Sequence, residues 1–219
     1  IINMEHHYLI TDPIPAFIER DREIPVMRDS LTAGYFRQEQ NSGLIGIYEH
    51  TGAVEAWAPK GVPEWASESE LFTEDLDRLM PWLGNALERM PVLADAGIKQ
   101  IFNGAISHTP DGPPLLGPVA GLKNFWLCCG ASFGIAQGAG CGKYLAQWML
   151  YGDADINMTG LDPRRFGVFA DDPYLRSTVF QDYCNTFVTP LPSEELPAGR
   201  AQRTSPLYET LKAQGAVHS

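Results

Sequence analysis

The sequence predicts an α+β (mixed α/β) fold, in which a mixed or antiparallel sheet is flanked by helices. Three patterns within its 219 residues support this prediction. Residues 33–49 have the composition of a β-hairpin, apolar residues recur at helical spacing from residue 69, and residues 121–150 have the pattern of a strand, a glycine-rich turn and a helix. A hydrophobic fraction of 44%, with 11% aromatic residues, is enough for a packed core.

The first elements are expected to be strands. Residues 6–11, HHYLIT, are rich in aromatic and β-branched side chains, and the two prolines of the following DPIPAF end this strand. In residues 33–39, AGYFRQE, the side chains of Tyr35, Arg37 and Glu39 share one face, and the turn former NSG separates them from GLIGIYE. These two runs predict a β-hairpin.

Helices are expected to follow the hairpin. From Ser69 onward, apolar residues recur at helical spacing in ESELFTEDLDRLMPWLGNALERMPVLADAG. Because proline removes a backbone donor and clashes with the preceding turn, Pro81 and Pro91 are expected to break this region into short helices.

The second half of the chain begins with two strands. Residues 99–118 predict a strand that enters the Pro/Gly-rich loop HTPDGPPLLGP, and the apolar run GLKNFWLCCG, residues 121–130, is long enough for a strand buried on both faces. This strand continues into CCGASFGIAQGAGCGKYLAQWML, residues 128–150, whose later apolar residues recur at helical spacing. The order is therefore strand, glycine turn and helix.

Beyond residue 151 the pattern is less regular. Residues 173–187, PYLRSTVFQDYCNTF, predict a helix, whereas the proline content of residues 189–206 is typical of a linker. Residues 205–219, SPLYETLKAQGAVHS, begin with a helix-start signal. Because the chain lacks an initiator methionine, enters a strand-like segment almost at once and stops soon after this signal, we expect it to be cut from a longer protein.

Charge and composition narrow the choice of partners. The net charge is −11 at pH 7 and no basic block is present, which disfavours binding to nucleic acid or to an anionic membrane surface. No apolar run reaches the ~20 residues that span a bilayer. The four cysteines form no CxxC pair and have no histidine at metal-ligand spacing. We therefore expect reduced thiols, no metal site, no nucleic-acid or membrane partner, and a small molecule or another protein as the partner.

Two phosphate-binding motifs fail at the glycine-rich turn. A dinucleotide fingerprint counted from Gly138 needs a glycine at its sixth position, which is Lys143, and a P-loop needs a glycine and a Ser or Thr where Gln137 and Tyr144 stand. What remains is a helix amino terminus whose unpaired N–H groups can hold partial negative charge, including the carbonyl of a ring that gains electrons. From the residues alone, close packing of the helix on the strand explains the glycines equally well.

Polar residues of the predicted strands are the other candidates. His6 and His7 must point to opposite faces, so at most one of them is expected to serve a site as a proton acceptor. Tyr35 and Arg37 can position a carboxylate, although an exposed face of an antiparallel strand has the same pattern. The loop HTPDGPPLLGP is either the wall of a ligand site or a tight structural connection.

A series of motifs in a fixed order resembles a known family. The motifs are EHHYLITDPIP, IPVMRD, YFRQE, GLIGIYE, ELFTEDLDRLMP, AGIKQIFNGAISHTPDGPPLLGP, NFWLCCGASFGIAQGAGCGKYLAQWM, LDPRRFG and PAGRAQRTSPLYETLKAQGAV. They resemble dimethylglycine and sarcosine dehydrogenases, flavin-dependent members of the D-amino-acid-oxidase-like superfamily, over essentially the whole chain. The resemblance implies part of that fold, with a substrate-binding domain at 1–103, a closing segment of the FAD-binding domain at 104–160, and a helical extension and linker at 161–219.

The same resemblance implies cofactors and catalytic residues. FAD is the implied cofactor, and tetrahydrofolate would bind through a further domain that this chain lacks. His6 resembles the active-site histidine that faces the substrate amine. Tyr35 resembles the active-site tyrosine near substrate and flavin, although Gly34 stands where many relatives have a second aromatic residue.

The implied contact with the flavin ring is the turn before the glycine-rich helix. The residues that resemble this turn are Ser132, Phe133, Gly134 and Ile135. Gly138, Gly140 and Gly142 would then be packing glycines within the helix.

The implied reaction is the oxidative N-demethylation of dimethylglycine, sarcosine or a related N-methyl amino acid. Hydride passes from the N-methyl carbon to flavin N5 and leaves an iminium, which is hydrolysed to formaldehyde or trapped by tetrahydrofolate. An electron-transfer flavoprotein or oxygen would reoxidise the flavin, in the cytoplasm of a bacterium or the mitochondrial matrix of a eukaryote. The alternative is a non-catalytic regulatory relative, similar to the pyruvate dehydrogenase phosphatase regulatory subunit.

Overall fold

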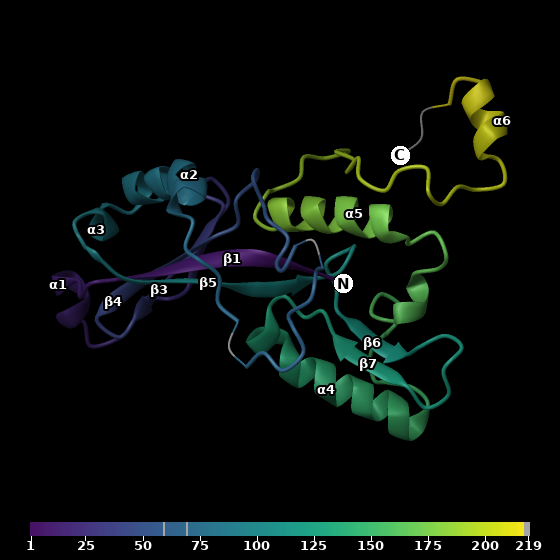
Figure 1. Cartoon of the computed structure of the whole chain (residues 1–219), viewed down its shortest axis with the longest axis horizontal. Coiled ribbons are helices and arrows are strands. Elements are labelled where there is room, and N and C mark those ends of the chain that lie inside the picture. The colour runs from purple at the N-terminus through teal and green to yellow at the C-terminus, as the bar shows by residue number, and fades with distance from the viewer. Residues whose placement is uncertain (59, 69, 217–219) are drawn as a thin grey trace. The chain divides into compact units, whose positions relative to one another are not determined.

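The computed structural model describes every residue of the chain except 59, 69 and 217–219. The described residues form two compact units, and Figure 1 labels most of their strands and helices. The first, called the sheet unit, comprises residues 2–107 and 183–189. The second, called the helix unit, comprises Ile1, residues 108–182 and the residues from Pro190 onward. The three-part division implied by the resemblance stays a prediction.

Among the described residues, five strands form one sheet in the order β2-β3-β4-β1-β5. Their bounds are Ile2–Thr11 (β1), Met27–Asp29 (β2), Gly34–Glu39 (β3), Ser42–Ile47 (β4) and Ile98–His108 (β5). Strands β3 and β4 pair antiparallel with Glu39 opposite Ser42, and β1 pairs antiparallel with β4. The predicted hairpin and the predicted strand over residues 6–11 are therefore confirmed.

Side chains alternate between the two faces of this sheet. Tyr35 and Arg37 lie on the more open face of β3, whereas Phe36 between them is buried in the apolar core. Three helices contribute residues to that core: α1 (Pro15–Ile18), α2 (Leu76–Arg89) and α3 (Pro91–Ala94). The alternation of side chains along β3 thus buries Phe36 in the core and leaves Tyr35 and Arg37 on the face that can line a site.

Pro81 does not break the helix that contains it. Helix α2 runs through this proline, and Asp75 caps its amino end by accepting a hydrogen bond of 3.2 Å from the backbone N–H of Arg78. A proline in the second turn removes one backbone hydrogen bond, and buried residues on both sides of it hold α2 in the core. The predicted break at Pro81 is wrong, whereas the break at Pro91 is confirmed, because α2 ends before it.

A buried polar cluster connects β1 to α2. The guanidinium of Arg78 lies 3.0 Å from Oε1 of Glu49 and 3.6 Å from Oε2 of Glu5. It also lies 3.0 Å from Nδ1 of His7, whose Nε2 is 3.1 Å from the backbone N–H of Asp75. Because both ring nitrogens face donors, an imidazolium would direct its two N–H groups toward other donors. Burial, reinforced by Arg78, lowers the pKa of His7 to about 4.

Stability is expected to fall as the pH drops from 6.5 toward 4, because in that window the unfolded chain protonates His7 and the folded protein does not. Replacing the imidazole in His7→Gln should remove about 2 kcal/mol of this pH dependence, a value reduced for partial solvent screening. The measurement is urea unfolding of the full-length protein and the variant at pH 7 and pH 4.5. Identical pH dependence in the two proteins would contradict the assignment.

The helix unit is built around a two-stranded sheet and a long helix. Its strands are β6 (Leu115–Pro118) and β7 (Trp126–Cys129), which pair antiparallel, and the helix is α4 (Gly134–Tyr151). Figure 1 shows α4 beside these two strands. Leu116, Cys141 and Met158 form the buried apolar cluster between them. The predicted order of strand, glycine turn and helix is confirmed.

Burial in the helix unit differs from two predictions. No residue of β7 is buried, and Cys128 is exposed, because among the described residues β7 pairs only with β6. The predicted burial of this strand on both faces is therefore wrong. A Cβ added at Gly138, Gly140 or Gly142 would meet no atom within 4 Å, so these glycines do not pack closely against any described residue.

The remaining elements are the 3₁₀ turn η1 (Pro163–Arg165), α5 (Asp172–Asn185) and α6 (Tyr208–Ala213). The helix predicted over residues 173–187 and the helix start near residue 205 are confirmed, and residues 217–219 of the last stretch lie outside the described residues. All four cysteines are free. Across the described part of the chain, no three His, Cys, Asp or Glu side chains gather as metal ligands, and no helix has the length and apolar character needed to cross a membrane.

Candidate functional site

His6 lies within a cluster of tyrosines in the sheet unit. It is buried on β1, with Nε2 3.1 Å from the hydroxyl of Tyr35 and Nδ1 3.2 Å from the hydroxyl of Tyr183. Its ring centroid is 4.3 Å from that of Tyr48. The structure therefore brings the two predicted catalytic residues, His6 and Tyr35, into hydrogen-bond contact. His7 points to the opposite face, as the alternation of a strand requires.

The ring of Tyr35 occupies space that a glycine leaves free. Gly46 is its partner across the β3–β4 pair, and a Cβ at Gly46 would lie 2.0 Å from Cζ of Tyr35. Burial, with a smaller contribution from Tyr8, raises the pKa of Tyr35 to about 12. Tyr35 therefore keeps its proton near neutral pH and can donate it to Nε2 of His6.

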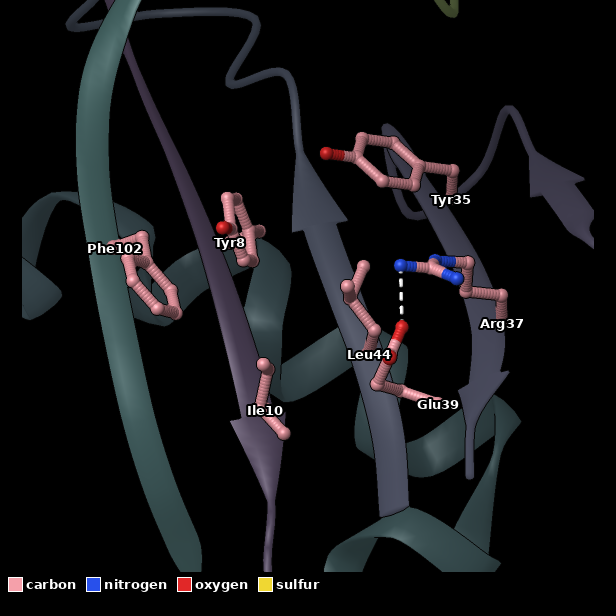
Figure 2. Close-up of a pocket in the computed structure, with 7 residues that line it drawn as sticks. All are labelled: Tyr8, Ile10, Tyr35, Arg37, Glu39, Leu44 and Phe102. Carbon is pink, nitrogen blue, oxygen red and sulfur yellow. Dashed lines mark ion pairs between the residues drawn. The ribbon is translucent and has the colours of Figure 1, made fainter. Parts of the chain in front are cut away.

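A hollow of about 410 Å³ opens beside Tyr35 and is drawn in Figure 2. Its lining residues are Tyr8, Ile10, Tyr35, Arg37, Glu39, Leu44 and Phe102. Tyr8 on β1 and Phe102 on β5 stack with ring centroids 4.7 Å apart, while Arg37 forms an ion pair with Glu39 on β3 (Figure 2). The hollow thus has an apolar wall and one cation, Arg37, which already pairs with the carboxylate of Glu39. Its volume suits a small molecule.

The residues predicted to contact flavin lie in the helix unit. Ser132 and Phe133 lead into α4, and Gly134 and Ile135 form its first turn. Phe133 is the N-cap but gives no side-chain hydrogen bond, and Ile135 is fully exposed. The first N–H groups of α4 consequently have no side-chain cap, and the positive end of the helix dipole suits a partial negative charge. This arrangement fits an apolar ring that presents a carbonyl oxygen to the helix end.

Tight contacts fix the chain just before this turn. Gly130 has φ +74°, and a Cβ there would lie 2.6 Å from Cγ2 of Thr109, so the position favours glycine. Thr109 belongs to the loop HTPDGPPLLGP and donates a hydrogen bond of 2.8 Å to the carbonyl of Pro113. Arg165 holds Asp111 of the same loop with contacts of 2.7 and 2.8 Å. Residues 109–114 are thus a tightly bonded connection, whose role as a ligand wall stays a prediction, whereas Leu115–Pro118, predicted as part of the loop, form β6.

Sequence reasoning missed the residues behind His6. Tyr183 is fully buried, and its hydroxyl donates to Oε2 of Glu49 at 2.9 Å. Tyr183 and His6 are 177 positions apart, and nothing in QDYCNTF distinguishes this tyrosine from an ordinary core residue. The one available signal was Glu49, an acidic residue two positions after the end of β4.

Comparison with known families assigns the class of protein. A profile described as FAD dependent oxidoreductase matches residues 1–148, and one described as FAD dependent oxidoreductase central domain matches residues 151–205. The chain therefore belongs to the FAD-dependent oxidoreductase family, and FAD is the cofactor of that family.

Individual relatives narrow the resemblance. The chain is 37% identical to "Dimethylglycine dehydrogenase, mitochondrial" of Mus musculus, over 98% of this chain and 25% of that protein. It is 32% identical to "Sarcosine dehydrogenase, mitochondrial" of Homo sapiens, over 99% of this chain and 23% of that protein. The chain spans about a quarter of the length of the curated relatives it matches. The family predicted from the motifs is therefore confirmed.

Solved structures support the fold. L-proline dehydrogenase from P.horikoshii matches with a TM-score of 0.59 and 20% identity, over 76% of this chain and 40% of that chain. Glycine oxidase from Geobacillus kaustophilus matches with a TM-score of 0.53 and 14% identity, over 75% of this chain and 40% of that chain. The predicted mixed fold of the D-amino-acid-oxidase type is thereby confirmed.

Proposed function

We propose that this chain is part of an FAD-dependent enzyme that oxidatively demethylates an N-methyl amino acid such as dimethylglycine or sarcosine. The observation that carries the proposal is the hydrogen-bonded pair of His6 and Tyr35 beside a small hollow. The sequence supports the substrate class, because the chain is 37% identical to a dimethylglycine dehydrogenase over 98% of its length.

His6 and Tyr35 manage the amine proton in the proposed reaction. An N-methyl amino acid enters as an ammonium ion, and only the neutral amine has the lone pair that allows hydride to leave the methyl carbon. Tyr35 holds its own proton and donates to Nε2 of His6, so the pair can take up the substrate proton by a relay. FAD, when bound, supplies the hydride acceptor. The iminium product is hydrolysed to formaldehyde or passed to tetrahydrofolate.

The hollow beside Tyr35 is the proposed site for the rest of the substrate. Tyr8 and Phe102 offer an apolar wall for methyl groups. Arg37 offers a guanidinium to the substrate carboxylate, which would compete with Glu39 for this cation. The substrate carboxylate would then bind Arg37 on β3, the strand that also carries Tyr35.

The amino terminus of α4 is the proposed contact with the flavin ring. Ser132, Phe133, Gly134 and Ile135 would present uncapped N–H groups to the ring carbonyl that gains negative charge on reduction. The exposed side chains of Phe133 and Ile135 offer an apolar surface to the same ring.

The proposal includes the electron acceptor of the reduced flavin and the cellular compartment of the enzyme. We expect an electron-transfer flavoprotein or oxygen to accept the electrons, and tetrahydrofolate to bind through another domain. The dimethylglycine and sarcosine dehydrogenases that the chain resembles are named as mitochondrial, which supports the mitochondrial matrix in a eukaryote. In a bacterium the cytoplasm is expected.

The test is anaerobic mixing of the full-length protein with dimethylglycine or sarcosine, followed at the flavin absorbance bands. Bleaching of bound flavin with release of formaldehyde is expected. The chain is also 32% identical to the pyruvate dehydrogenase phosphatase regulatory subunit of Mus musculus, over 97% of this chain. A protein that carries no flavin, or whose flavin no N-methyl amino acid reduces, would favour this regulatory alternative.

His6→Asn is expected to slow flavin reduction about 100-fold, because asparagine cannot accept the proton that Tyr35 passes on. The readout is the limiting rate at saturating substrate in the full-length protein. His50→Asn is the matched control, since His50 contacts the backbone carbonyl of Cys184 rather than the pair. A native rate in His6→Asn would remove His6 from the reaction.

A further inference from the structure

Tyr183 links His6 to a buried ion pair. Its side chain has no exposed surface, and its hydroxyl lies 3.2 Å from Nδ1 of His6 and 2.9 Å from Oε2 of Glu49. The backbone carbonyl oxygen of Glu5 lies 3.1 Å from the same hydroxyl. Glu49 is also fully buried, and its other oxygen, Oε1, is 3.0 Å from Nε of Arg78. A continuous series of contacts therefore runs from His6 through Tyr183 to the ion pair.

The single hydroxyl hydrogen of Tyr183 sets the direction of these hydrogen bonds. The carboxylate of Glu49 and the carbonyl of Glu5 can only accept, and Oε2 of Glu49, at 2.9 Å, is the nearer of the two. The hydroxyl hydrogen is therefore assigned to Glu49, and the oxygen of Tyr183 accepts from Nδ1–H of His6. A neutral imidazole with its hydrogen on Nδ1 has its lone pair on Nε2, which accepts from the hydroxyl of Tyr35. Each group thus donates to the next, from Tyr35 to Glu49.

The nearest charged groups behind Tyr183 are the carboxylate of Glu49 and the guanidinium of Arg78. Burial, reinforced by Glu49, raises the pKa of Tyr183 well above 10.0, so Tyr183 keeps its hydrogen. Burial raises the pKa of Glu49, while its own backbone N–H, the nearby Arg78 and the hydroxyl of Tyr183 oppose that rise. The guanidinium of Arg78, with Nε 3.0 Å from Oε1, is the counter-ion of the Glu49 carboxylate. An imidazolium at His6 would be one hydroxyl group away from this carboxylate. Water does not screen the attraction, because Tyr183 and Glu49 are both fully buried.

We propose that Tyr183 and Glu49 are positioning residues that hold the hydrogen of His6 on Nδ1 and stabilise the imidazolium formed during demethylation. The step rests on the proposed function. The substrate ammonium gives a proton to the oxygen of Tyr35 while Tyr35 gives its own hydroxyl proton to Nε2 of His6. The substrate is left as a neutral amine, Tyr35 is again a neutral phenol, and His6 carries the positive charge. Tyr183 donates to Glu49 throughout and loses no proton.

The first arm of the test is kinetic and uses Tyr183→Phe in the full-length, flavin-loaded protein. The limiting rate of flavin reduction by dimethylglycine is expected to fall at least about 10-fold. The acid limb of its pH profile should move to lower pH, because a less stabilised imidazolium loses its proton more readily. Tyr35 and Tyr48 also face His6, and neither is altered in this variant.

A second variant separates the charge from the hydrogen bond. Glu49→Gln keeps an oxygen that can accept from Tyr183 but removes the negative charge, while the guanidinium of Arg78 and the carboxylate of Glu5 stay in place. The acid limb is again expected to move to lower pH, since the positive charge of Arg78 is then less compensated. Tyr151→Phe, which removes an exposed hydroxyl from α4, is the matched control and should leave rate and profile unchanged.

The second arm reads the tautomer without turnover. With ¹⁵N-labelled histidine, the His6 signal, assigned by its absence in His6→Asn, is expected to show the hydrogen on Nδ1 in the native protein at pH 8. In Tyr183→Phe this preference should disappear, because Nδ1–H has lost its acceptor. An otherwise structural tyrosine would change thermal stability without changing the tautomer.

The outcomes separate the two proposals. If no N-methyl amino acid reduces the native flavin, the proposed function fails, and the tautomer measurement still decides whether Tyr183 positions His6. If the native protein is reduced while Tyr183→Phe keeps its rate, pH profile and tautomer, the positioning role is overturned. If Tyr183→Phe does not fold, Glu49→Gln decides the question, and an unshifted pH profile in that variant overturns the proposal.

Discussion

Gly46→Ala is expected to slow flavin reduction by an N-methyl amino acid about 100-fold in the full-length protein. The added methyl carbon would lie 2.0 Å from Cζ and 2.3 Å from the hydroxyl oxygen of Tyr35, so the tyrosine ring must rotate away. Rotation breaks the 3.1 Å contact between Tyr35 and His6. The measurement is the anaerobic rate of flavin bleaching at saturating substrate, with bound flavin quantified in each preparation.

Two further variants isolate the cause of that loss. Gly84→Ala is the matched control, because a Cβ at Gly84 meets no atom within 4 Å and this residue lies in α2; alanine there should add about 0.5–1 kcal/mol of stability. Tyr35→Phe alone should be nearly as slow as Gly46→Ala, and the double variant should be little slower than either, since both changes remove one interaction. Additive losses would mean that Gly46 acts through something other than Tyr35.

Local patterns predicted the part of the site that lies within one hairpin. The period of two along AGYFRQE placed Tyr35 and Arg37 on one face, and in the structure both line the hollow. The same period separated His6 from His7, and each now has its own partners. Such predictions succeed because the geometry of a strand fixes side-chain direction without reference to the rest of the fold.

Contacts between distant segments were beyond the reach of local patterns. The bond between His6 and Tyr183 joins residues 177 positions apart, and the ion pair of Arg78 with Glu49 joins a helix to the segment after β4. Pro81 shows the same limit in another form. Its propensity to end a helix is real, but burial of the residues around it in the core keeps α2 intact.

The two errors in the helix unit have a common physical cause. Apolar composition predicted that β7 would be covered, and glycine content predicted close packing at Gly138, Gly140 and Gly142, yet β7 and these three glycines are open in the described part of the chain. Amino-acid composition indicates whether a surface tends to be buried, but it does not indicate which segment would cover that surface. The predicted fold class is nevertheless correct, because it depends on the order of strands and helices, which was predicted correctly.

Arg78→Met is expected to lower the free energy of unfolding by about 3–5 kcal/mol, because it leaves a buried carboxylate without its counter-ion. The side chain of Glu49 has no exposed surface, and that of Arg78 is 7% exposed. Urea unfolding of the full-length protein and the variant measures this loss. On the same helix, Arg89 pairs with Asp29 while 49% exposed, so Arg89→Met, the matched control, should cost at most about 1 kcal/mol.

The pH dependence of that loss identifies Glu49 as its source. Burial already raises the pKa of Glu49, and removal of Arg78 takes away the positive charge that opposed the rise, so the carboxyl takes up a proton more readily. Once it is protonated, Glu49 no longer carries a fully buried charge without a counter-ion, and the destabilisation of Arg78→Met should shrink as the pH is lowered toward 5. Adding Glu49→Gln to Arg78→Met should restore part of the stability at pH 7 in the same way. A loss that does not vary with pH and survives the second substitution would instead place the role of Arg78 in packing or in its contact with His7.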